Sequence, residues 1–223
     1  MPVEVETKDC TNLSDAELTD LADLCAAGPA RFDIGVLSKA RDAWVLVTMA
    51  RIEGKLHGFS FTTLERIGGT PCVLIGLAHV KRTSQRNSVM KGLMTELYRR
   101  ALSAFPDEDV VVGAKFADPS GLEAFKSLEE IIPRPDHRAV GEERAWGRRL
   151  VKRFGVEGTY DDQAFTVKGT GGVVGVFDHD SLKPEAVKPE VAALFKGLKP
   201  AKGDCLIVHG WAMAENLLKL GAP

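Results

Sequence analysis

Cationic and polar side chains gather at one point of the chain and have the composition of a site for a phosphorylated ligand. The group comprises Lys81, Arg82, Ser84, Arg86, Asn87, Ser88 and Lys91. A pattern with helical spacing follows from residue 89, so the group lies at the start of a predicted helix. The first N–H groups of a helix lack intrahelical partners and the helix dipole is positive there, so both attract an anion. The alternative interpretation is a solvated basic corner that does no more than begin a helix.

One titratable side chain stands just before this group and could act in catalysis. His79 lies at the end of an apolar run, and residues 72–80 contain no Asp or Glu. An imidazole changes its charge near neutral pH, so it can take a proton from a reacting group. His79 is therefore the candidate general base, and a histidine with a structural role at a strand end is the alternative.

Two other motifs resemble functional sites but lack the residues or the spacing that such sites need. Asp178, His179 and Asp180 are metal-ligand types, but no second His or Cys cluster accompanies them, so we predict no metal site. The glycine-rich residues 169–175 do not have the G-x-G-x-x-G spacing of a nucleotide loop, and they separate short apolar runs at 164–167 and 173–177. We therefore expect a β-hairpin there.

The elements that must position these groups predict a mixed α/β fold. Residues 72–80 have the pattern of a buried strand, and residues 89–104 that of a helix whose apolar stripe faces a sheet. Ser14 and Glu17 have capping-box spacing at the start of a helix that ends at Gly28 and Pro29. Further strands are expected at residues 3–7, 44–52, 56–64, 109–116 and 204–209. Further helices are expected at residues 35–41, 121–128, 142–154, 189–196 and 212–220.

The bulk composition is that of a soluble globular protein. The 223 residues are 44% hydrophobic and 27% charged, and the formal net charge of -2 argues against a general nucleic-acid binder. The cysteines, Cys10, Cys25, Cys72 and Cys205, lie far apart, which indicates buried thiols in a reducing compartment. No secretory signal and no apolar run of membrane-spanning length is visible. We therefore expect a cytoplasmic protein without a membrane or nucleic-acid partner.

The order of strand, helices, three strands, long helix, strand and helix resembles the GNAT (Gcn5-related N-acetyltransferase) fold. The similarity is strongest over residues 73–128 and extends from residue 3 to about residue 128. In that family the fourth strand ends in a loop of pattern R/Q-x-x-G-x-G/A, whose backbone amides hold the pyrophosphate of acyl-CoA. Residues 85–90 match this loop with Gln85 at the first position and Ser88 at the first glycine, while Met90 stands where the family has a small residue.

The resemblance implies an acyltransferase that moves an acetyl or other acyl group from acyl-CoA to a small-molecule or peptide amine. The acyl carbonyl would bond to strand backbone at Leu77 to His79, and the pyrophosphate would lie at the helix start. The implied cofactor-binding residues are Leu77, Ala78, His79, Val80, Gln85, Arg86, Asn87, Ser88, Val89, Met90 and Lys91. Residues 1–133 would form the GNAT-like acyl-CoA-binding core. Residues 134–223 would form a C-terminal extension of strands and helices. Two interpretations of this extension stay open: a partial second lobe and a homodimer contact.

An alternative follows from the departures from the family pattern. Many family members use a carboxylate on the fourth strand as base and a tyrosine on the fourth helix as acid. This chain has neither in the matching places, since Phe125 stands near the expected tyrosine and cannot donate a proton. Together with Met90, this favours a GNAT-fold binding or assembly module without acyl-CoA catalysis. A third interpretation is a different α/β protein whose corner binds a nucleotide, although no second nucleotide motif is present.

Overall fold

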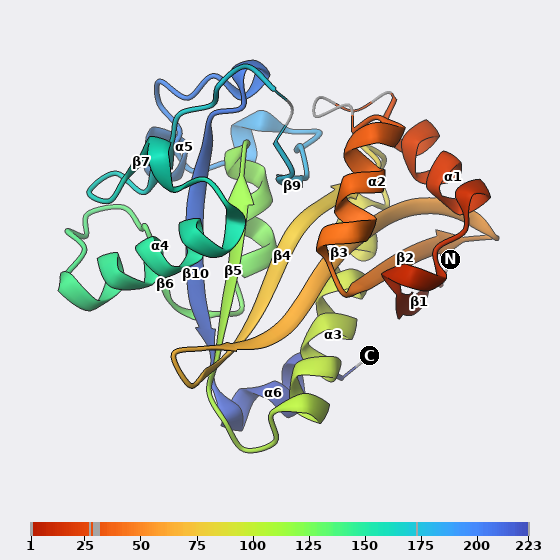
Figure 1. Cartoon of the computed structure of the whole chain (residues 1–223), viewed down its shortest axis with the longest axis horizontal. Coiled ribbons are helices and arrows are strands. Elements are labelled where there is room, and N and C mark those ends of the chain that lie inside the picture. The colour runs from red at the N-terminus through yellow and green to blue at the C-terminus, as the bar shows by residue number, and fades with distance from the viewer. Residues whose placement is uncertain (1, 27, 29–31, 173, 223) are drawn as a thin grey trace.

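The structure, a computed structural model, describes residues 2–26, 28, 32–172 and 174–222, and over these residues the strands form one 10-stranded sheet (Figure 1). The strands are β1 (Glu4–Asp9), β2 (Leu46–Ile52), β3 (Lys55–Ile67), β4 (Thr70–Val80), β5 (Val110–Phe116), β6 (Glu129–Ile132), β7 (Tyr160–Asp161), β8 (Thr166–Val167), β9 (Phe177–Asp178) and β10 (Cys205–Ala212). The α-helices are α1 (Asp15–Cys25), α2 (Ile34–Ala43), α3 (Arg86–Ala104), α4 (Gly141–Phe154), α5 (Pro189–Ala193) and α6 (Ala214–Leu220). Pro29 and Val173, which belong to the predicted helix end and hairpin, lie outside the described residues.

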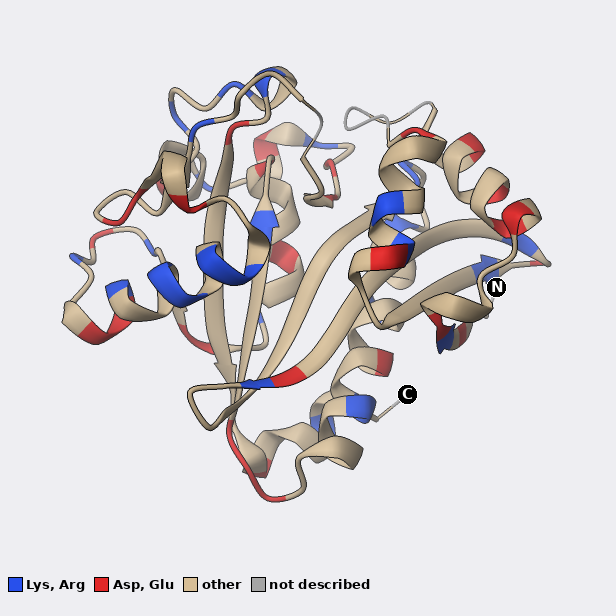
Figure 2. Ribbon diagram, viewed as in Figure 1, with Lys and Arg blue, Asp and Glu red and all other residues tan. Residues whose placement is uncertain are grey.

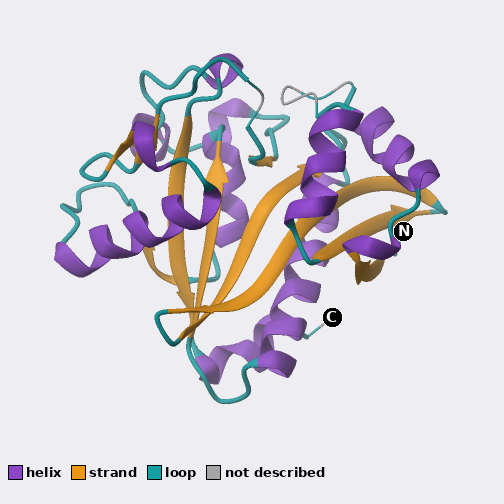
Figure 3. Ribbon diagram, viewed as in Figure 1, coloured by secondary structure: helices purple, strands orange, loops and turns teal. Residues whose placement is uncertain are grey.

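The sheet is mixed, with its parallel pairing at the centre (Figure 3). β1, β2, β3 and β4 pair antiparallel in that order. β4 and β5 then pair in parallel over a short stretch, from Cys72 opposite Val111 to Ile75 opposite Ala114. β10 pairs antiparallel with β5 and with β6, so the strand nearest the C-terminus lies between them.

Helices cover both faces of the sheet and enclose two apolar cores (Figure 1). α3 and α6 pack together on one face, where Met94, Leu97 and Leu217 join buried residues of β4 and β5. α1, α2 and α4 cover the other face, and Leu21 and Leu37 are among their buried residues there. This strand order and helix placement confirm the predicted GNAT-like mixed sheet flanked by helices.

Local predictions at helix starts are confirmed in part. Ser14 Oγ accepts from Glu17 N–H, and a Glu17 carboxylate oxygen accepts from Ser14 N–H at 2.9 Å, so the capping box forms. α3 begins at Arg86 rather than at residue 89, so Arg86, Asn87 and Ser88 of the predicted basic corner belong to its first turn. The short helix expected at residues 121–128 is a 3-10 helix at residues 119–125. The Asp118 carboxylate accepts from Ser120 N–H at 2.8 Å, which tightens this turn at its start.

The predicted hairpin around residues 169–172 is wrong. β8 pairs with β7 and β10, whereas β9 pairs with β4 and β5. The Asp204 carboxylate accepts from Gly169 N–H at 2.9 Å, from Lys199 N–H at 3.0 Å and from Lys168 Nζ at 3.1 Å. These bonds hold the glycine-rich residues against the loop that precedes β10. The chain therefore does not turn back onto β8 but continues to the centre of the sheet.

β10 crosses the predicted division of the chain at residue 133. Leu206 and Val208 of β10 are fully buried in the same core as Val112 of β5. The register along this pair is continuous from Leu206 opposite Phe116 to Ala212 opposite Val110. Residues 1–133 and 134–223 consequently share one sheet and one core.

Candidate functional site

β4 and β5 part beyond their paired residues, and a segment from the C-terminal part of the chain fills the space between them (Figure 1). We name residues 174–181 the inserted segment. Its strand β9 pairs in parallel with β4, where Ala78 lies opposite Phe177, and with β5, where Phe116 lies opposite Phe177. Ala78 N–H donates to Val176 O at 3.1 Å. The β4 backbone that the resemblance assigns to the acyl group is thus paired with the chain's own strand.

A buried histidine–carboxylate pair holds the inserted segment to β4. His79 Nδ1 and Asp178 Oδ2 lie 2.7 Å apart, and the two side chains are only 3% and 6% exposed. A Cβ placed on Gly28 would lie 2.5 Å from His79 Cε1, so the chain packs directly over the pair. With Nδ1 donating to the carboxylate, Nε2 is the ring atom that can accept a proton. The predicted base is therefore oriented by a carboxylate and enclosed by the fold.

Both arginines of the predicted corner contact the inserted segment. Arg82 forms an ion pair with Asp180 at 2.7 Å and donates to Ser181 O at 3.2 Å. Arg86 Nη2 donates to Ser181 Oγ at 3.4 Å, while its buried Nε has no partner among the described residues. Burial raises the pKa of the Asp180 carboxyl above its ordinary value, and the charge of Arg82 opposes that rise. The corner thus binds one carboxylate of its own chain and keeps a guanidinium N–H free.

The first turn of α3 opens onto two adjoining cavities. Gln85 precedes the helix, and its side chain makes no capping hydrogen bond. The polar side chains of the first cavity, of about 400 Å³, are Arg86, Asn87, Ser120, Glu123, Lys126, His179, Ser181 and Lys188. The polar side chains of the second, of about 620 Å³, are Asn87, Ser88, Lys91, Thr95, Tyr98, Glu123, Lys126, Ser127 and Lys219. Cations outnumber the single carboxylate in both linings, so both cavities suit a negatively charged ligand.

His179 adds uncommitted nitrogen atoms to the smaller cavity. The residue is 2% exposed, and neither ring nitrogen has a hydrogen-bond partner within the described part of the chain. Burial lowers the pKa of His179, and the charge of Arg86 lowers it further. A neutral imidazole beside a helix start can donate one hydrogen bond and accept another, which adds to the polar character of this cavity.

The structure brings together only some of the predicted site residues. Asn87, Ser88 and Lys91 lie on the exposed side of α3 beside the cavities. Val89 and Met90 are 1% and 6% exposed and belong to the core beneath the helix, although Met90 also borders the larger cavity. The predicted β4 residues are all buried: Leu77, Ala78, His79 and Val80. The predicted ligand contacts therefore divide into an open helix start and an enclosed strand end.

The inserted segment is the part of the site that sequence reasoning missed. Asp178, His179 and Asp180 were considered only as metal ligands, and no metal-binding group of three or more His, Cys, Asp or Glu occurs in the described ranges. The sequence feature that indicates this segment is the cluster Asp178, His179 and Asp180, which directly follows an apolar run. Nothing local in that run indicates which strand it joins, because the partner His79 lies 99 positions earlier.

The thiols offer no nucleophile in this region. Cys10, Cys25, Cys72 and Cys205 are buried and free, and burial raises their pKa values to about 11 or 12. A thiol with so high a pKa is almost entirely protonated at neutral pH and reacts poorly. In the part of the chain that is described, no helix is both long and apolar enough to cross a bilayer.

Comparison with known proteins found similar structures but no matching sequence family. No protein-family model matches the chain, and no curated protein matches its sequence. The aminoglycoside 6'-N-acetyltransferase from Enterococcus faecium is 15% identical with a TM-score of 0.41, over 52% of this chain and 62% of that one. The ribosomal-protein-alanine N-acetyltransferase from Brucella melitensis biovar Abortus 2308 is 19% identical with a TM-score of 0.36, over 46% and 73%. An aminoglycoside N-acetyltransferase in complex with CoA is 13% identical with a TM-score of 0.37, over 47% and 72%. Each of these is a similarity of fold over about half of this chain.

Proposed function

We propose that the chain is a GNAT-type N-acyltransferase that moves an acetyl or other acyl group from acyl-CoA to an amine acceptor. The observation that supports this best is the uncapped, cationic first turn of α3 at the end of β4, beside two polar cavities. Backbone N–H groups and the helix dipole at that turn favour a diphosphate. The four cysteines are buried with raised pKa values, so a covalent thiol intermediate is not part of the proposal.

The residues at the helix start fit the diphosphate end of such a donor. Arg86 and Lys91 would pair with phosphate oxygens, and the backbone N–H groups of Asn87 and Ser88 would donate to them. Acyl-CoA, when bound, supplies an acyl group already activated as a thioester. His79 would take the proton of the acceptor amine.

The enclosed strand end fits the acyl portion of the donor only after the inserted segment moves. Ala78 N–H is already bonded to Val176 O, and the Phe177 ring stacks on Phe116 with centroids 5.4 Å apart. Withdrawal of residues 174–181 would free the β4 backbone and open a path to His79. The proposal therefore includes this withdrawal as a condition for binding the acyl group.

A second candidate function is favoured by the same inserted segment. A GNAT-fold module for binding or assembly needs no open space between β4 and β5, and this chain fills that space with Phe177, which is 2% exposed. The polar cavities beside α3 would then bind a phosphorylated ligand without any acyl transfer. The two candidates differ in whether the acyl portion of the donor adds affinity.

Calorimetric titration with acetyl-CoA and with adenosine 3'-phosphate 5'-diphosphate, the nucleotide part of CoA, separates the two candidates. The acyltransferase is expected to bind acetyl-CoA, and to bind it more tightly than the nucleotide fragment, because the acyl portion makes contacts of its own. Arg86→Gln should weaken acetyl-CoA binding by about 10-fold or more, since it removes a charge-assisted contact of about 1.5–3 kcal/mol. Arg138→Gln, at an exposed position away from α3, is the matched control and should bind like the wild type. Equal affinity for fragment and acetyl-CoA would favour the binding module, and no binding of acetyl-CoA at millimolar concentration would rule out the acyltransferase.

A further inference from the structure

A third cavity lies on the face of the sheet opposite α3. Its volume is about 310 Å³, and its charged and aromatic side chains are Lys39, Trp44, Lys115, Arg153 and Phe154. Ile75 and Ala114 are the last paired residues of β4 and β5, and Gly76 and Lys115 follow them directly. The cavity therefore begins where the two strands part, under the cover of α2 and α4.

Lys115 is a buried cation without a counter-charge. The residue is 6% exposed, and within the described ranges its ammonium takes part in no ion pair and no hydrogen bond. Its Nζ lies 5.0 Å from the centroid of the Phe154 ring, which is a cation–π contact. Such a contact stabilises an ammonium less than burial of an unpaired charge destabilises it. Burial accordingly lowers the pKa of Lys115 below its ordinary value.

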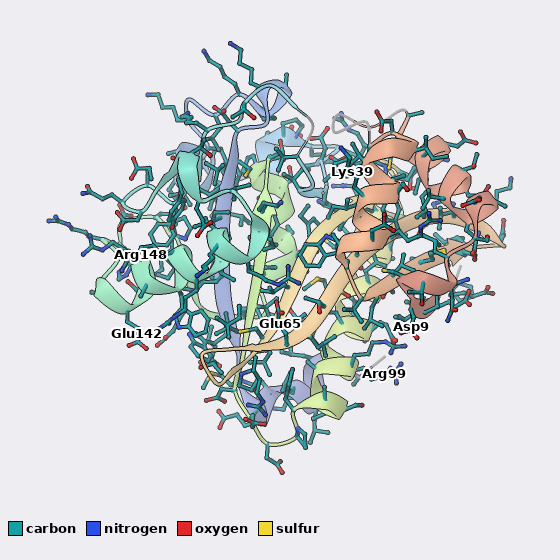
Figure 4. All side chains as sticks on the ribbon, viewed as in Figure 1. Asp9, Lys39, Glu65, Arg99, Glu142 and Arg148 are labelled. Carbon is teal, nitrogen blue, oxygen red and sulfur yellow. The ribbon has the colours of Figure 1, made fainter. Side chains whose placement is uncertain are left out.

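The other charged side chains at this cavity are also cationic. Lys39, which is labelled in Figure 4, comes from α2, and Arg153 comes from the end of α4. Arg153 Nε donates to the Glu65 carboxylate at 2.6 Å, so Glu65 is already committed. The described lining contains no Asp or Glu. Figure 2 shows Lys and Arg along α4 and on α2 on this side of the molecule, so the local field favours an anion.

Aromatic rings give the cavity an apolar wall. The ring centroids of Trp44 and Phe154 lie 6.1 Å apart, and the guanidinium of Arg153 lies 5.2 Å from the Trp44 ring. Gly76 leaves no room for a Cβ against the Trp44 indole, so the ring rests directly on the β4 backbone. A ligand in this cavity would meet the Trp44 and Phe154 rings together with the Lys115 ammonium.

We propose that this cavity binds a small organic carboxylate, whose oxygens accept hydrogen bonds from Lys115 Nζ and whose apolar part lies against Trp44 and Phe154. The carboxylate would supply the counter-charge that the described residues do not provide. The volume is at the lower end of the roughly 300–1,000 Å³ of small-molecule sites, so the ligand is a small one. The helix start of α3 lies on the opposite face of the sheet, so carboxylate binding is tested without acyl-CoA. Leu77 of β4 and Gly175 of the inserted segment also line this cavity, so withdrawal of that segment would change its shape.

The probe for this site is sodium benzoate, with benzamide as the neutral analogue of the same shape. Calorimetric titration of the full chain at pH 7 is expected to give saturable benzoate binding and affinity for benzamide at least about tenfold lower. Benzoate should also change the fluorescence of Trp44, which lines the cavity. Equal affinity for benzoate and benzamide, or no saturable binding of benzoate, would overturn the proposal. This comparison uses the wild type and needs no variant to fold.

A substitution that removes the Lys115 ammonium tests where the anion binds. Lys115→Met keeps most of the side-chain length and is expected to weaken benzoate binding by at least about tenfold. Without benzoate, this variant should melt at or above the wild-type temperature, because an unpaired buried charge has been removed. Lys152→Met, at an exposed position of α4, is the matched control and should bind benzoate like the wild type. Unchanged benzoate binding by Lys115→Met would contradict the assigned contact.

Discussion

At the scale of single residues, two buried histidines have different partners. His79 faces the Asp178 carboxylate at 2.7 Å. His209 on β10 is 1% exposed, its Nε2 lies 3.3 Å from the Glu143 carbonyl oxygen, and its Nδ1 has no partner among the described residues. Burial lowers the pKa of His209 to about 4, although Glu143 opposes the change. His209 is therefore neutral in the folded protein at pH 7.

His209 should make the protein sensitive to mild acid. Its pKa is about 4 when folded and near 6.5 when unfolded, so between these values the unfolded chain binds the proton more readily. The stability is fully present above about pH 6.5 and falls as the pH drops towards 4, by up to about 3 kcal/mol for this group. His209→Gln cannot take up the proton, so its stability should fall less over the same range. Urea unfolding at pH 7 and pH 4.5 measures the difference, and an equal loss in both proteins would exclude His209 as the cause.

At the scale of elements, the inserted segment is held by side chains more than by its strand. β9 consists of Phe177 and Asp178 alone. Phe177 stacks on Phe116, Asp178 binds His79, and Asp180 binds Arg82. A strand this short has few backbone bonds of its own, so loss of one anchor should open it locally before the sheet unfolds.

Phe177→Ala should release the inserted segment. Removal of a buried phenylalanine side chain costs about 3–5 kcal/mol, and at this position the cost falls on the contacts of β9 with β4 and β5. The Ala78 amide, which donates to Val176 O, should then exchange its hydrogen more than about tenfold faster than in the wild type. If the proposed acyltransferase function holds, this variant should also bind acetyl-CoA more tightly.

Phe165→Ala provides the matched control for this measurement. Phe165 is also buried, at 1% exposed, but it lies beside β8 rather than between β4 and β5. Its loss should lower the overall free energy of unfolding without exposing the Ala78 amide selectively. Unchanged exchange at Ala78 in Phe177→Ala would mean that the inserted segment is held by other contacts.

At the scale of the whole molecule, the C-terminal part of the chain completes the central sheet. β10 covers the edge of β5 along seven residue pairs and separates it from β6. α6 then packs against α3 on the face that carries the predicted helix start. The candidate site therefore depends on residues from the middle of the chain and from its C-terminal part.

A fragment of residues 1–133 should not form a cooperative fold. Without β10, the buried strand β5 would expose an unpaired apolar edge, and the core around Val112 would lose Leu206 and Val208. Circular dichroism during urea unfolding should show a sharp transition for the full chain and a broad or absent one for the fragment. A sharp transition in the fragment would instead support the division of the chain at residue 133.

Much of the local structure could be predicted from the sequence because it depends on neighbouring residues. Ser14 and Glu17 are three positions apart and form their capping box within one turn. The strands before Val80 and the start of α3 depend on local periodicity, and their predicted bounds lie within a few residues of the observed ones. The hairpin prediction failed because Asp204, from a distant loop, controls the path of Gly169.

The sequence by itself determined a mixed α/β fold and a cationic helix start around Arg86, since apolar periodicity and charge are local properties. Only the tertiary structure decided what stands beside that corner. Asp178 meets His79 across 99 positions, and Asp180 meets Arg82, because the chain passes between β4 and β5 after leaving β8. Pairing between distant strands depends on the packing of the whole sheet, which no short stretch of sequence encodes. The helix start predicted as an open phosphate site is consequently observed next to a strand end that the protein fills with its own residues.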